Sequence, residues 1–230
     1  MRTLFISDIH LSVQREDITQ AFLHFLHHTA TTVDRLYILG DLFEFWVGDD
    51  DLTPFHLSIM HELKLLVDSG VRIYFQHGNR DFMIGKRFAK RTGIALLPEE
   101  QVITVNQKRI LLMHGDSLCT DDERYQAYRK KVNQPWLQWL FLRLPLSYRR
   151  KLGHKIHSKS GQDKQQKSVE IMDVNAKAVE AVMQKHQVHY LIHGHTHRPK
   201  VHKLSETPLM QRIVLGAWFD GEWVLDAADL

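Results

Sequence analysis

Seven residues that offer oxygen or imidazole donors stand in five short motifs spread along the chain. The motifs are DIH, GD, GNRD, HGD and GHTH, and the donors are Asp8, His10, Asp41, Asn79, His114, His195 and His197. Most of these motifs, read alone, are commonly tight turns, because Asp, Asn and Gly favour turns. The GHTH motif is more specific, since two imidazoles at i and i+2 of an extended segment point to the same side. Together the motifs predict a metal centre.

The number and type of the donors predict two metal ions. Seven donors exceed the coordination of one ion but fill two if a carboxylate bridges them, and Asp41 is the natural bridge. Two ions ~3.5 to 4 Å apart can activate a water and neutralise the attacking and leaving oxygens at phosphorus. Asn79 can coordinate only through its carbonyl oxygen, which leaves its amide to orient a phosphate. Donors of these types, without thiolate, suit Mn, Fe, Zn or Ni.

Apolar segments precede most of the motifs and predict the strands that position them. Strands are expected at residues 3–7, 36–39, 72–75, 101–105, 109–113, 190–192, 201–204, 213–215 and 223–225. Helices are expected at residues 18–26, 54–69 and 168–186. A hairpin around Asn106 would be absent from a purely parallel sheet, so the pattern predicts an α/β fold, a mixed-sheet sandwich flanked by helices. Ligands collect at strand carboxyl ends in such sheets, and the motifs lie there.

The composition is that of one globular domain carrying an insertion. The chain has 230 residues, 43% of them hydrophobic, which suffices for a single large core. We expect one domain over residues 1–230, with a helical cap insertion at 120–167, where the strand signal disappears. The single cysteine, Cys119, excludes an internal disulfide and favours a reducing compartment. A cleavable leader would remove Asp8, and no segment reaches the ~20 apolar residues of a spanning helix, so a cytoplasmic location is expected.

Basic residues are concentrated in the expected insertion. Residues 124–167 contain twelve Lys and Arg and a single acid, a local net charge of +11, whereas the whole chain carries +3. Such asymmetry indicates an anionic partner, which could be a phosphate, a nucleic acid or an anionic membrane face. Most of these side chains are interpreted as solvated helix faces and some as contacts to anionic lipid.

The order of the motifs resembles that of the calcineurin-like metallophosphoesterases. The resemblance implies a two-sheet sandwich with helices outside, which agrees with the mixed sheet inferred above. It also implies two ligand sets that share one carboxylate. One ion would be held by Asp8, His10, Asp41 and His197, and the other by Asp41, Asn79, His114 and His195.

One residue departs from the pattern common in that superfamily. Many members have GNHD, in which the histidine is thought to protonate the leaving oxygen, whereas this chain has Arg80. A guanidinium does not release its proton in proteins, but it pairs tightly with phosphate oxygens. An enzyme without that acid should favour a leaving group that departs as an anion. Arg80 therefore suggests cleavage of a P–O–P bond rather than of a simple alkyl phosphodiester.

Longer segments resemble the UDP-2,3-diacylglucosamine pyrophosphatases of lipid A biosynthesis. These segments are GDLFEFWVGDDD, GNRDFMIGKRFA, MHGDSLCTDD, PWLQWLFLRLP, KSVEIMDVN and IHGHTHRPKVH. The resemblance implies attack of water on the α-phosphate of UDP-2,3-diacylglucosamine, giving UMP and 2,3-diacylglucosamine 1-phosphate. It implies two divalent ions, Mn²⁺ being expected, and catalytic roles for Asn79, Arg80 and His195. The implied substrate contacts are Asn79, Arg80, Asp122, Ser160, Lys164, Lys167 and His195, although position 164 is often Asn in that family.

Several interpretations remain open at this stage. The cluster Trp136, Trp139 and Phe141 either packs a core of the insertion or contacts acyl chains or a membrane interface. Trp46 and the acidic residues 49–51 either line a pocket mouth or form a loop. The protein is expected to be a monomer, peripheral on the cytoplasmic face of the inner membrane, with a nucleotide-lipid substrate and no nucleic-acid partner. The alternatives are a phosphodiesterase or nuclease using the same metals, and a non-enzymatic scaffold.

Overall fold

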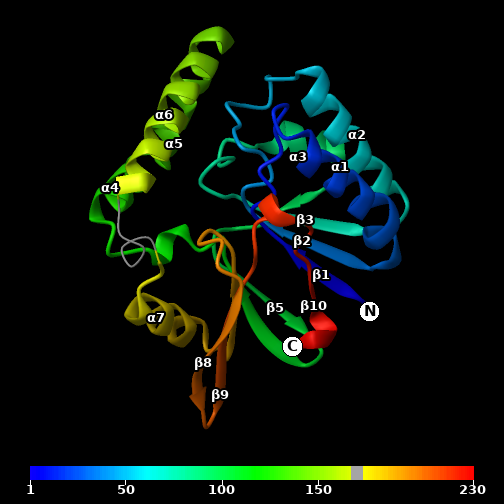
Figure 1. Ribbon diagram of the computed structural model, residues 1–230, viewed down its shortest axis with the longest axis vertical. Coiled ribbons are helices and arrows are strands. Elements are labelled where there is room, and N and C mark those ends of the chain that lie inside the picture. The colour runs from blue at the N-terminus through cyan, green and yellow to red at the C-terminus, as the bar shows by residue number, and fades with distance from the viewer. Residues whose placement is uncertain (167–172) are drawn as a thin grey trace.

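Two five-stranded sheets face each other, and helices cover their outer surfaces (Figure 1). The structure is a computed structural model that describes residues 1–166 and 173–230, without the side chains of residues 157–166 and of Asp220. The sheets each combine parallel and antiparallel neighbours. The predicted α/β fold, a mixed-sheet sandwich flanked by helices, is therefore confirmed.

The first sheet has the strand order β10-β1-β2-β3-β4. Strands β1 to β4 are parallel, and β10 is antiparallel to β1. Their bounds are β1 Thr3–Ile6, β2 Arg35–Leu39, β3 Arg72–Gln76, β4 Ala95–Leu96 and β10 Leu225–Asp226. The register pairs Leu4 with Leu36 and Leu36 with Ile73, so the parallel strands end close together.

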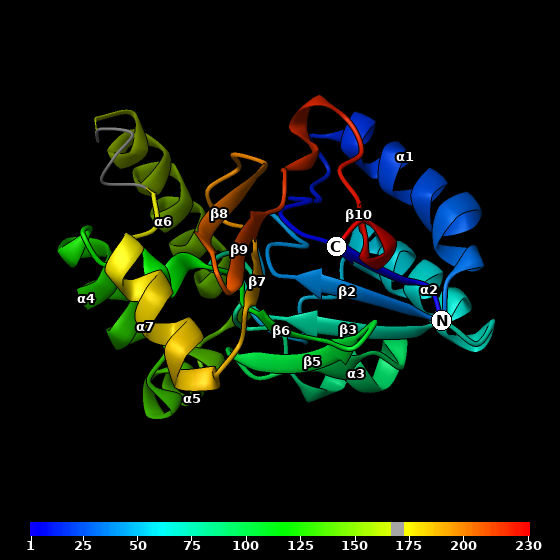
Figure 2. The ribbon, with the colours of Figure 1, turned by 90° about the horizontal axis from the view of Figure 1, so that it is seen from below.

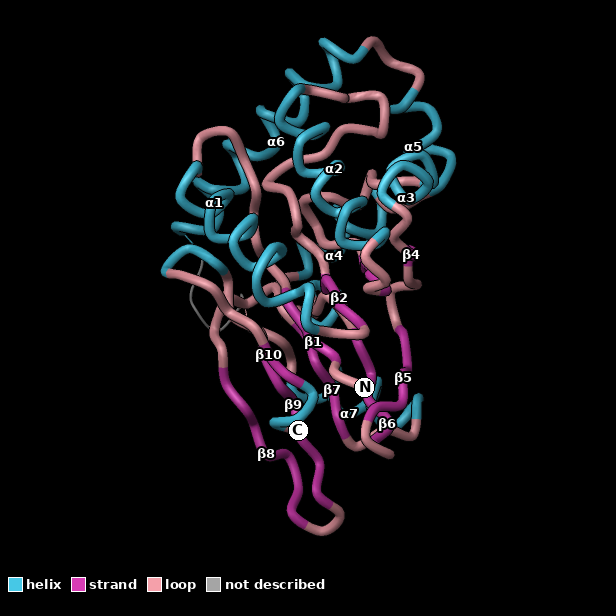
Figure 3. Tube along the Cα trace, turned by 90° about the vertical axis from the view of Figure 1, so that its right-hand side faces the viewer, coloured by secondary structure: helices cyan, strands magenta, loops and turns pink. Residues whose placement is uncertain are grey.

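The second sheet has the strand order β5-β6-β7-β9-β8. Strands β6, β7 and β9 are parallel, and two hairpins add the antiparallel edge strands β5 and β8. Their bounds are β5 Gln101–Val105, β6 Lys108–Leu112, β7 Tyr190–His193, β8 Lys200–Glu206 and β9 Leu209–Val214. The β8–β9 hairpin projects beyond the other strands of this sheet (Figure 3). The hairpin between β5 and β6 confirms the sequence prediction.

Strict alternation of side chains along the strands divides the core into layers. In β1, Leu4 and Ile6 face the helices α1 (Glu16–His24), α2 (Pro54–Asp68) and α3 (Lys86–Thr92), whereas Phe5 faces the second sheet. In β6, Ile110 and Leu112 face the first sheet, and Leu111 faces helix α7 (Ala176–His186). This two-residue period is expected of a strand buried on both faces. The result is a four-layer arrangement of helix, sheet, sheet and helix.

The helices of the outer layers have clear sequence signals at most of their ends. Their bounds are α1 Glu16–His24, α2 Pro54–Asp68, α3 Lys86–Thr92 and α7 Ala176–His186. Helix α1 continues as a π-helical turn at Phe25–Thr29. The Thr53 side chain caps α2, whose first residue is Pro54, as proline favours. The helices predicted at 18–26 and 54–69 are thus confirmed with small shifts.

One predicted helix begins later than expected. The prediction covered residues 168–186, but α7 begins at Ala176 because the Asn175 side chain accepts hydrogen bonds from the backbone N–H groups of residues 177 and 178. Residues 168–172 of that prediction lie outside the described part of the chain. The short α3 and β4 were not predicted. Helix α3 is a seven-residue helix, and only Phe88 and Thr92 are buried in it.

Three further helices follow β6, in the region where an insertion was predicted. They are α4 Glu123–Val132, α5 Pro135–Leu142 and α6 Leu146–Gln166, and together they are called the α4–α6 segment below. Helix α6 extends away from the two sheets on the side opposite α1 (Figure 1). No residue of α4 or α5 is fully buried. Among the described residues, no helix combines the length and apolar character that crossing a membrane requires.

Candidate metal centre and adjoining pocket

The candidate ligands come together because each follows the carboxyl end of a strand. Asp8 and His10 follow β1, Asp41 follows β2, and Asn79 follows β3 in the first sheet. The remaining three imidazoles follow β6 and β7 in the second sheet. Backbone hydrogen bonds join the segments, since Asp8 N donates to the oxygen of residue 40 at 3.1 Å and His10 N to that of Asp41 at 3.0 Å. The centre therefore lies where the two sheets meet.

The backbone at the centre is held in an unusual conformation. Five of the candidate ligands are left-handed, with φ values of 52° at Asp8, 56° at His10, 53° at Asp41, 68° at His195 and 56° at His197. Residues other than glycine rarely adopt this backbone conformation, and each such residue costs on the order of 1 to 3 kcal/mol of folding free energy. Such strain concentrates at functional sites. The other non-glycine residues with positive φ in the described chain are Asn106, Gln107 and Gln187, so most of this strain lies at the candidate ligands.

Two glycines make room for the buried carboxylates. A Cβ at Gly78 would lie 2.1 Å from Asp41 Oδ1, and a Cβ at Gly194 would lie 2.2 Å from Asp8 Oδ2. No larger residue fits at either position without displacing a carboxylate. Close packing against the two carboxylates therefore explains why glycine stands at these positions of the GNRD and GHTH motifs.

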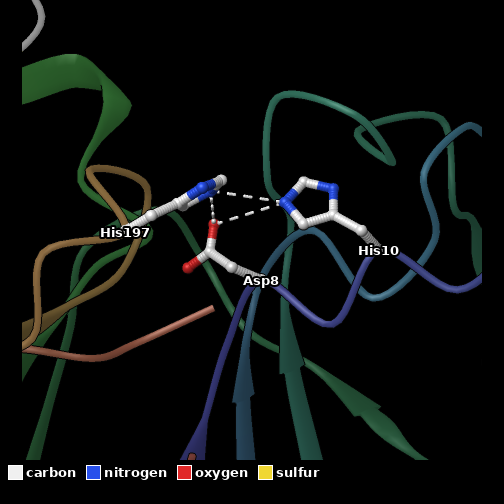
Figure 4. Close-up of side chains that lie close together, drawn as sticks. All are labelled: Asp8, His10 and His197. Carbon is white, nitrogen blue, oxygen red and sulfur yellow. Dashed lines mark hydrogen bonds and ion pairs between the residues drawn. The ribbon is translucent and has the colours of Figure 1, made fainter. Parts of the chain in front are cut away.

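Asp8, His10 and His197 point toward one another (Figure 4). The His10 and His197 Nε2 atoms are 3.3 Å apart, and His197 Nε2 lies 3.2 Å from Asp8 Oδ1. The other oxygen, Asp8 Oδ2, accepts hydrogen bonds from Ser7 Oγ at 2.6 Å and from His195 N at 2.9 Å. Only Oδ1 of Asp8 therefore faces the two imidazoles.

The second group of donors surrounds His114. Its Nε2 atom lies 3.1 Å from Asn79 Oδ1 and 3.8 Å from Asp41 Oδ1. The His195 ring stands edge-on to the His114 ring, with 5.1 Å between centroids. Asp8, Asp41 and His114 also have ligand atoms close enough to share one cation. The structure thus brings all seven sequence-predicted ligands into one cluster.

Asp41 lies between the two groups. Its Oδ2 atom is 3.8 Å from His10 Nε2, while its Oδ1 atom is 3.8 Å from His114 Nε2. Oδ1 also accepts a hydrogen bond from Arg80 N at 2.8 Å, which fixes the carboxylate. One oxygen toward each group is the arrangement that a bridging carboxylate needs.

The donor set fits divalent cations. Asp8, Asp41, His10 and His114 are each at most 3% exposed, so the charges are removed from water. The Nδ1 atom of His114 lies 2.8 Å from the carbonyl oxygen of Leu39, which directs its Nε2 lone pair into the cluster. Burial opposes protonation of His114, but Asp41 and Asp8 raise its pKa to about 9. The carboxylates therefore favour positive charge at this place, which bound cations would supply.

Glu44 orients the His10 imidazole from outside the cluster, and the sequence prediction missed it. Glu44 Oε2 lies 2.9 Å from His10 Nδ1, and Oε1 lies 3.9 Å from the Arg80 guanidinium. Burial opposes the shift, but Glu44 and Asp41 raise the pKa of His10. A carboxylate behind a ligating imidazole fixes its tautomer and raises its basicity. The only sequence signal was an acid three residues after Asp41.

Replacing Glu44 by alanine should weaken metal binding and turnover by about 10- to 100-fold, the usual effect of losing such a partner. Glu44→Gln should lose less, because its amide oxygen can still accept from His10 Nδ1. Calorimetric titration of the metal-free protein with Mn²⁺ measures the metal affinity of each variant. The dependence of turnover on Mn²⁺ concentration measures its activity. Glu62→Ala is a matched control, since Glu62 pairs with His27 on the surface. Unchanged Mn²⁺ affinity in Glu44→Ala would contradict this role.

Two buried acids of the motifs hold backbone and helices rather than facing the cluster. Asp81 accepts hydrogen bonds from Gly78 N at 2.9 Å and Leu42 N at 2.7 Å, and burial followed by the Asp41 charge raises its pKa to about 7. Asp116 accepts from Tyr125 Oη at 2.8 Å and from Arg129 Nε at 2.6 Å. Asp116 thereby ties α4 to the end of β6. The motifs contained both acids, but their spacing gave no sign of these partners.

Helix α6 is attached to the loop after β2 by two arginines. Arg149, which is 2% exposed on its side chain, pairs with Asp50 and donates to the carbonyl oxygen of Val47 at 2.7 Å. Arg150 pairs with Asp51 at 2.5 Å. Asp49, in turn, accepts from the backbone N–H groups that begin α3. The acidic residues 49–51 therefore form a loop, the second of the two interpretations, and their carboxylates hold this loop to α3 and α6.

An apolar pocket of about 240 Å³ lies between the α4–α6 segment and the loops after β2 and β3. Asn79, Arg80 and Glu44 line it, so the pocket adjoins the metal cluster. Its apolar walls are formed by Phe45, Trp46, Val47, Phe82, Met83, Tyr128, Val132, Leu137, Phe141, Leu152 and Ile156. The residues that line it come from both the loops and the helices. The cavity suits an elongated apolar group attached to a polar head at the cluster.

The structure distributes the remaining predicted substrate contacts unevenly. Arg80 lies in the pocket wall beside the cluster, with a side chain 13% exposed. Asp122 caps α4, accepting from Tyr125 N at 3.0 Å. Ser160 and Lys164 belong to the last turns of α6, whose side chains are not described there, and Lys167 lies outside the described residues.

The predicted aromatic cluster of the insertion is divided by the structure. Phe141 and Trp46 line the pocket. Trp136 and Trp139 are 63% and 57% exposed, and the Arg143 guanidinium lies 3.9 Å from the Trp139 ring centroid. The interpretation that the three aromatics form a core of the insertion is therefore wrong for the two tryptophans, because α5 has no buried residue.

Comparisons with known proteins identify the family and the relatives of this chain. Residues 1–199 match the family described as calcineurin-like phosphoesterase. The chain is 53% identical to proteins named UDP-2,3-diacylglucosamine hydrolase from Escherichia coli O139:H28 (strain E24377A / ETEC) and Serratia proteamaculans (strain 568), covering 100% of this chain and 96% of each relative. The solved structure of a protein described as a novel archaeal phosphodiesterase is also similar. The alignment covers 100% of this chain and 95% of the archaeal chain, with 12% sequence identity and a TM-score of 0.49.

Proposed function

Since the chain belongs to the calcineurin-like phosphoesterase family, whose members are metal-dependent hydrolases, we propose that it hydrolyses the pyrophosphate bond of UDP-2,3-diacylglucosamine. The observation that carries the proposal is the apolar pocket that opens beside the ligand cluster at Asn79 and Arg80. An apolar chamber next to a phosphoesterase centre suits a lipid joined to phosphate. The names of relatives that are 53% identical over the full chain support the same substrate.

The proposed reaction transfers the α-phosphorus from the bridging oxygen to water. Water adds to the α-phosphorus and releases its protons to solvent, while the bond from that phosphorus to the bridging oxygen breaks. The products are UMP and 2,3-diacylglucosamine 1-phosphate, the latter carrying the bridging oxygen and its electron pair. A departing phosphate monoester is a weak base and leaves without protonation. The reaction therefore needs no acid at position 80.

The residues of this chain have distinct roles in the proposal. Arg80, with a guanidinium in the pocket wall, pairs with the phosphate oxygens. The Asn79 amide orients the phosphate while its oxygen faces His114. His195 lies beside His114 in the ligand cluster and would contact the phosphate there. Asp122, Ser160, Lys164 and Lys167 are assigned to the sugar and phosphate by resemblance.

Two divalent ions, with Mn²⁺ as the preferred metal, are part of the proposal. Asp8, His10, Asp41 and His197 would hold one, and Asp41, Asn79, His114 and His195 the other. When bound, such ions lower the pKa of water and offset negative charge at phosphorus. The position of Asp41, with one oxygen toward each imidazole group, supports the shared carboxylate.

We also propose that the α4–α6 segment lies against an anionic membrane surface, so that the protein is peripheral to the membrane. The chain is proposed to form a single domain and to be a monomer. Trp136 and Trp139 are exposed on α5, and basic residues lie on the neighbouring α4. Exposed tryptophan beside Lys and Arg suits the interface of an anionic membrane.

The proposed function is tested by incubating the purified protein with Mn²⁺ and UDP-2,3-diacylglucosamine and following UMP release. UMP should form with metal and disappear after chelation. A dialkyl phosphodiester should be a much poorer substrate, because Arg80 cannot protonate an alkoxide leaving group. Metal-loaded protein that releases no UMP would refute the assignment. Faster cleavage of the dialkyl diester or of single-stranded DNA would favour a phosphodiesterase or nuclease instead.

A further inference from the structure

A pyrophosphate substrate must extend from the ligand cluster in two directions. The uridine is attached to the α-phosphorus and the lipid to the β-phosphorus, so the two groups extend from the reacting centre at different points. The pocket is bounded by α4, α5 and α6 and by the loops after β2 and β3. In Figure 2, these three helices lie on the left, and the red segment that precedes β10 lies to their right, at the top of the view. That segment contains a 3₁₀ turn at Trp218–Asp220.

The red segment places an aromatic ring over the ligand cluster. The Phe219 ring stacks on His10, with 5.3 Å between centroids and 17° between planes. It also stands edge-on to His197, at 5.3 Å between centroids. Phe219 is nevertheless 40% exposed. A large apolar ring that is partly open to solvent and contacts two candidate ligands has surface left for a substrate group.

The position of Phe219 is fixed by its neighbours. The backbone N–H of Trp218 donates to the carbonyl oxygen of Asp8 at 3.3 Å. The Trp218 side chain is 1% exposed and packs edge-on against Phe25, with 5.5 Å between centroids. Arg15 donates to the Phe219 carbonyl oxygen at 3.4 Å, and its guanidinium lies 5.8 Å from the ring centroid. A ring held in this way does not need to be ordered by the ligand.

We propose that Phe219 is the stacking platform for the uracil ring of the substrate, an inference that rests on the proposed function. A nucleobase has a flat π-face, and stacking on an aromatic side chain is a common way for a protein to bind it. The ring contacts His10 and His197, and it is not among the residues that line the pocket that would hold the lipid. The base would stack on the exposed part of the Phe219 ring, beside its contacts with His10 and the Arg15 guanidinium.

The test compares UMP with ribose 5-phosphate as inhibitors of the Mn²⁺-loaded enzyme. Both carry the sugar phosphate, so the ratio of their inhibition constants measures the contribution of the base. Phe219→Leu keeps an apolar side chain over His10 but removes the aromatic ring, whereas Phe219→Trp keeps a ring. Tyr148→Leu serves as a control, because Tyr148 is an aromatic residue 55% exposed on α6. Mn²⁺ affinity and inhibition by 2,3-diacylglucosamine 1-phosphate are measured for each variant.

Phe219→Leu should weaken UMP inhibition by roughly 5- to 100-fold and abolish the preference for UMP over ribose 5-phosphate. Phe219→Trp and Tyr148→Leu should keep that preference, and Mn²⁺ affinity and inhibition by the lipid product should not change. An unchanged preference in Phe219→Leu overturns the platform while leaving the proposed function standing. The platform is also overturned if Phe219→Leu weakens Mn²⁺ affinity and weakens inhibition by UMP and by the lipid product in parallel. The ring would then serve only the metal centre. No UMP release by the wild-type protein overturns both proposals.

Discussion

Asp41→Asn is expected to lower kcat for UMP release by at least about 1,000-fold, or roughly 4 kcal/mol of transition-state stabilisation. Asp41 is the residue with one oxygen toward His10 and the other toward His114, both at 3.8 Å. Its loss should therefore reduce binding of both ions. Metal content after gel filtration, measured by atomic emission, should fall from two per chain to less than one.

The comparison with Asp8→Asn makes this expectation specific. Asp8 Oδ2 is occupied by Ser7 and by the backbone of His195, so Asp8 offers a single oxygen to the cluster. Its replacement should reduce occupancy of one site more than of the other. Asp68→Asn is a surface control, since the Asp68 side chain is exposed and pairs with Lys64 one helical turn away. Equal metal loss in Asp8→Asn and Asp41→Asn would contradict Asp41 as the bridge.

The second large effect is expected from Gly153→Val in α6. A Cβ at Gly153 would lie 1.7 Å from Cζ of Phe45, so a side chain there must displace the helix or the ring. Both residues line the pocket. Turnover of UDP-2,3-diacylglucosamine should fall by about 100-fold, because a displacement on the order of 1 Å at a positioning wall has this effect. Hydrolysis of bis(p-nitrophenyl) phosphate, which lacks acyl chains, should remain within about 2-fold of wild type.

The double variant Gly153→Val/Phe45→Ala separates a blocked pocket from a damaged fold. Removing the Phe45 ring gives the valine space, so turnover of the lipid substrate should partly return, as expected of two residues in contact. Lys151→Val, on the exposed face of the same helix, controls for valine in α6. Equal losses with both substrates in Gly153→Val would show that the substitution acts on the metal centre or on stability instead.

The sequence predicted the ligand cluster because each motif directly follows a strand. Contiguity in the chain is enough when parallel strands end together, and this is why Asp8 and Asp41 could be assigned without a structure. Glu44 and Asp116 could not be assigned in the same way. Their functions depend on Arg80, Arg129 and other residues that are distant along the chain. A local sequence pattern cannot show which distant residue an acid will contact in the folded protein.

Secondary structure was predicted least accurately where burial is slight. Strand β8 was predicted only over residues 201–204, because it has no buried residue and its sequence lacks the alternation that marks a strand with one covered face. The insertion was predicted to be helical but without bounds for its helices, because α4 and α5 bury nothing completely and their helical period carries little signal. In α7, by contrast, Asn175 marks the first turn, and the buried Val179, Val182 and Met183 follow at helical spacing. Among the described residues, the prediction erred there only at 173–175, which precede the helix.

The ligands are divided between the sheets, and this gives bound cations a second role in the molecule. Asp8 and Asp41 belong to the first sheet, while His114 and His197 belong to the second. Cations held by both would act as cross-links between the two halves of the sandwich. In a chain with one cysteine, these cross-links would replace the covalent ones that it cannot form within itself. Because binding to the folded state alone favours that state, the metal supply would set the stability of this protein as well as its rate.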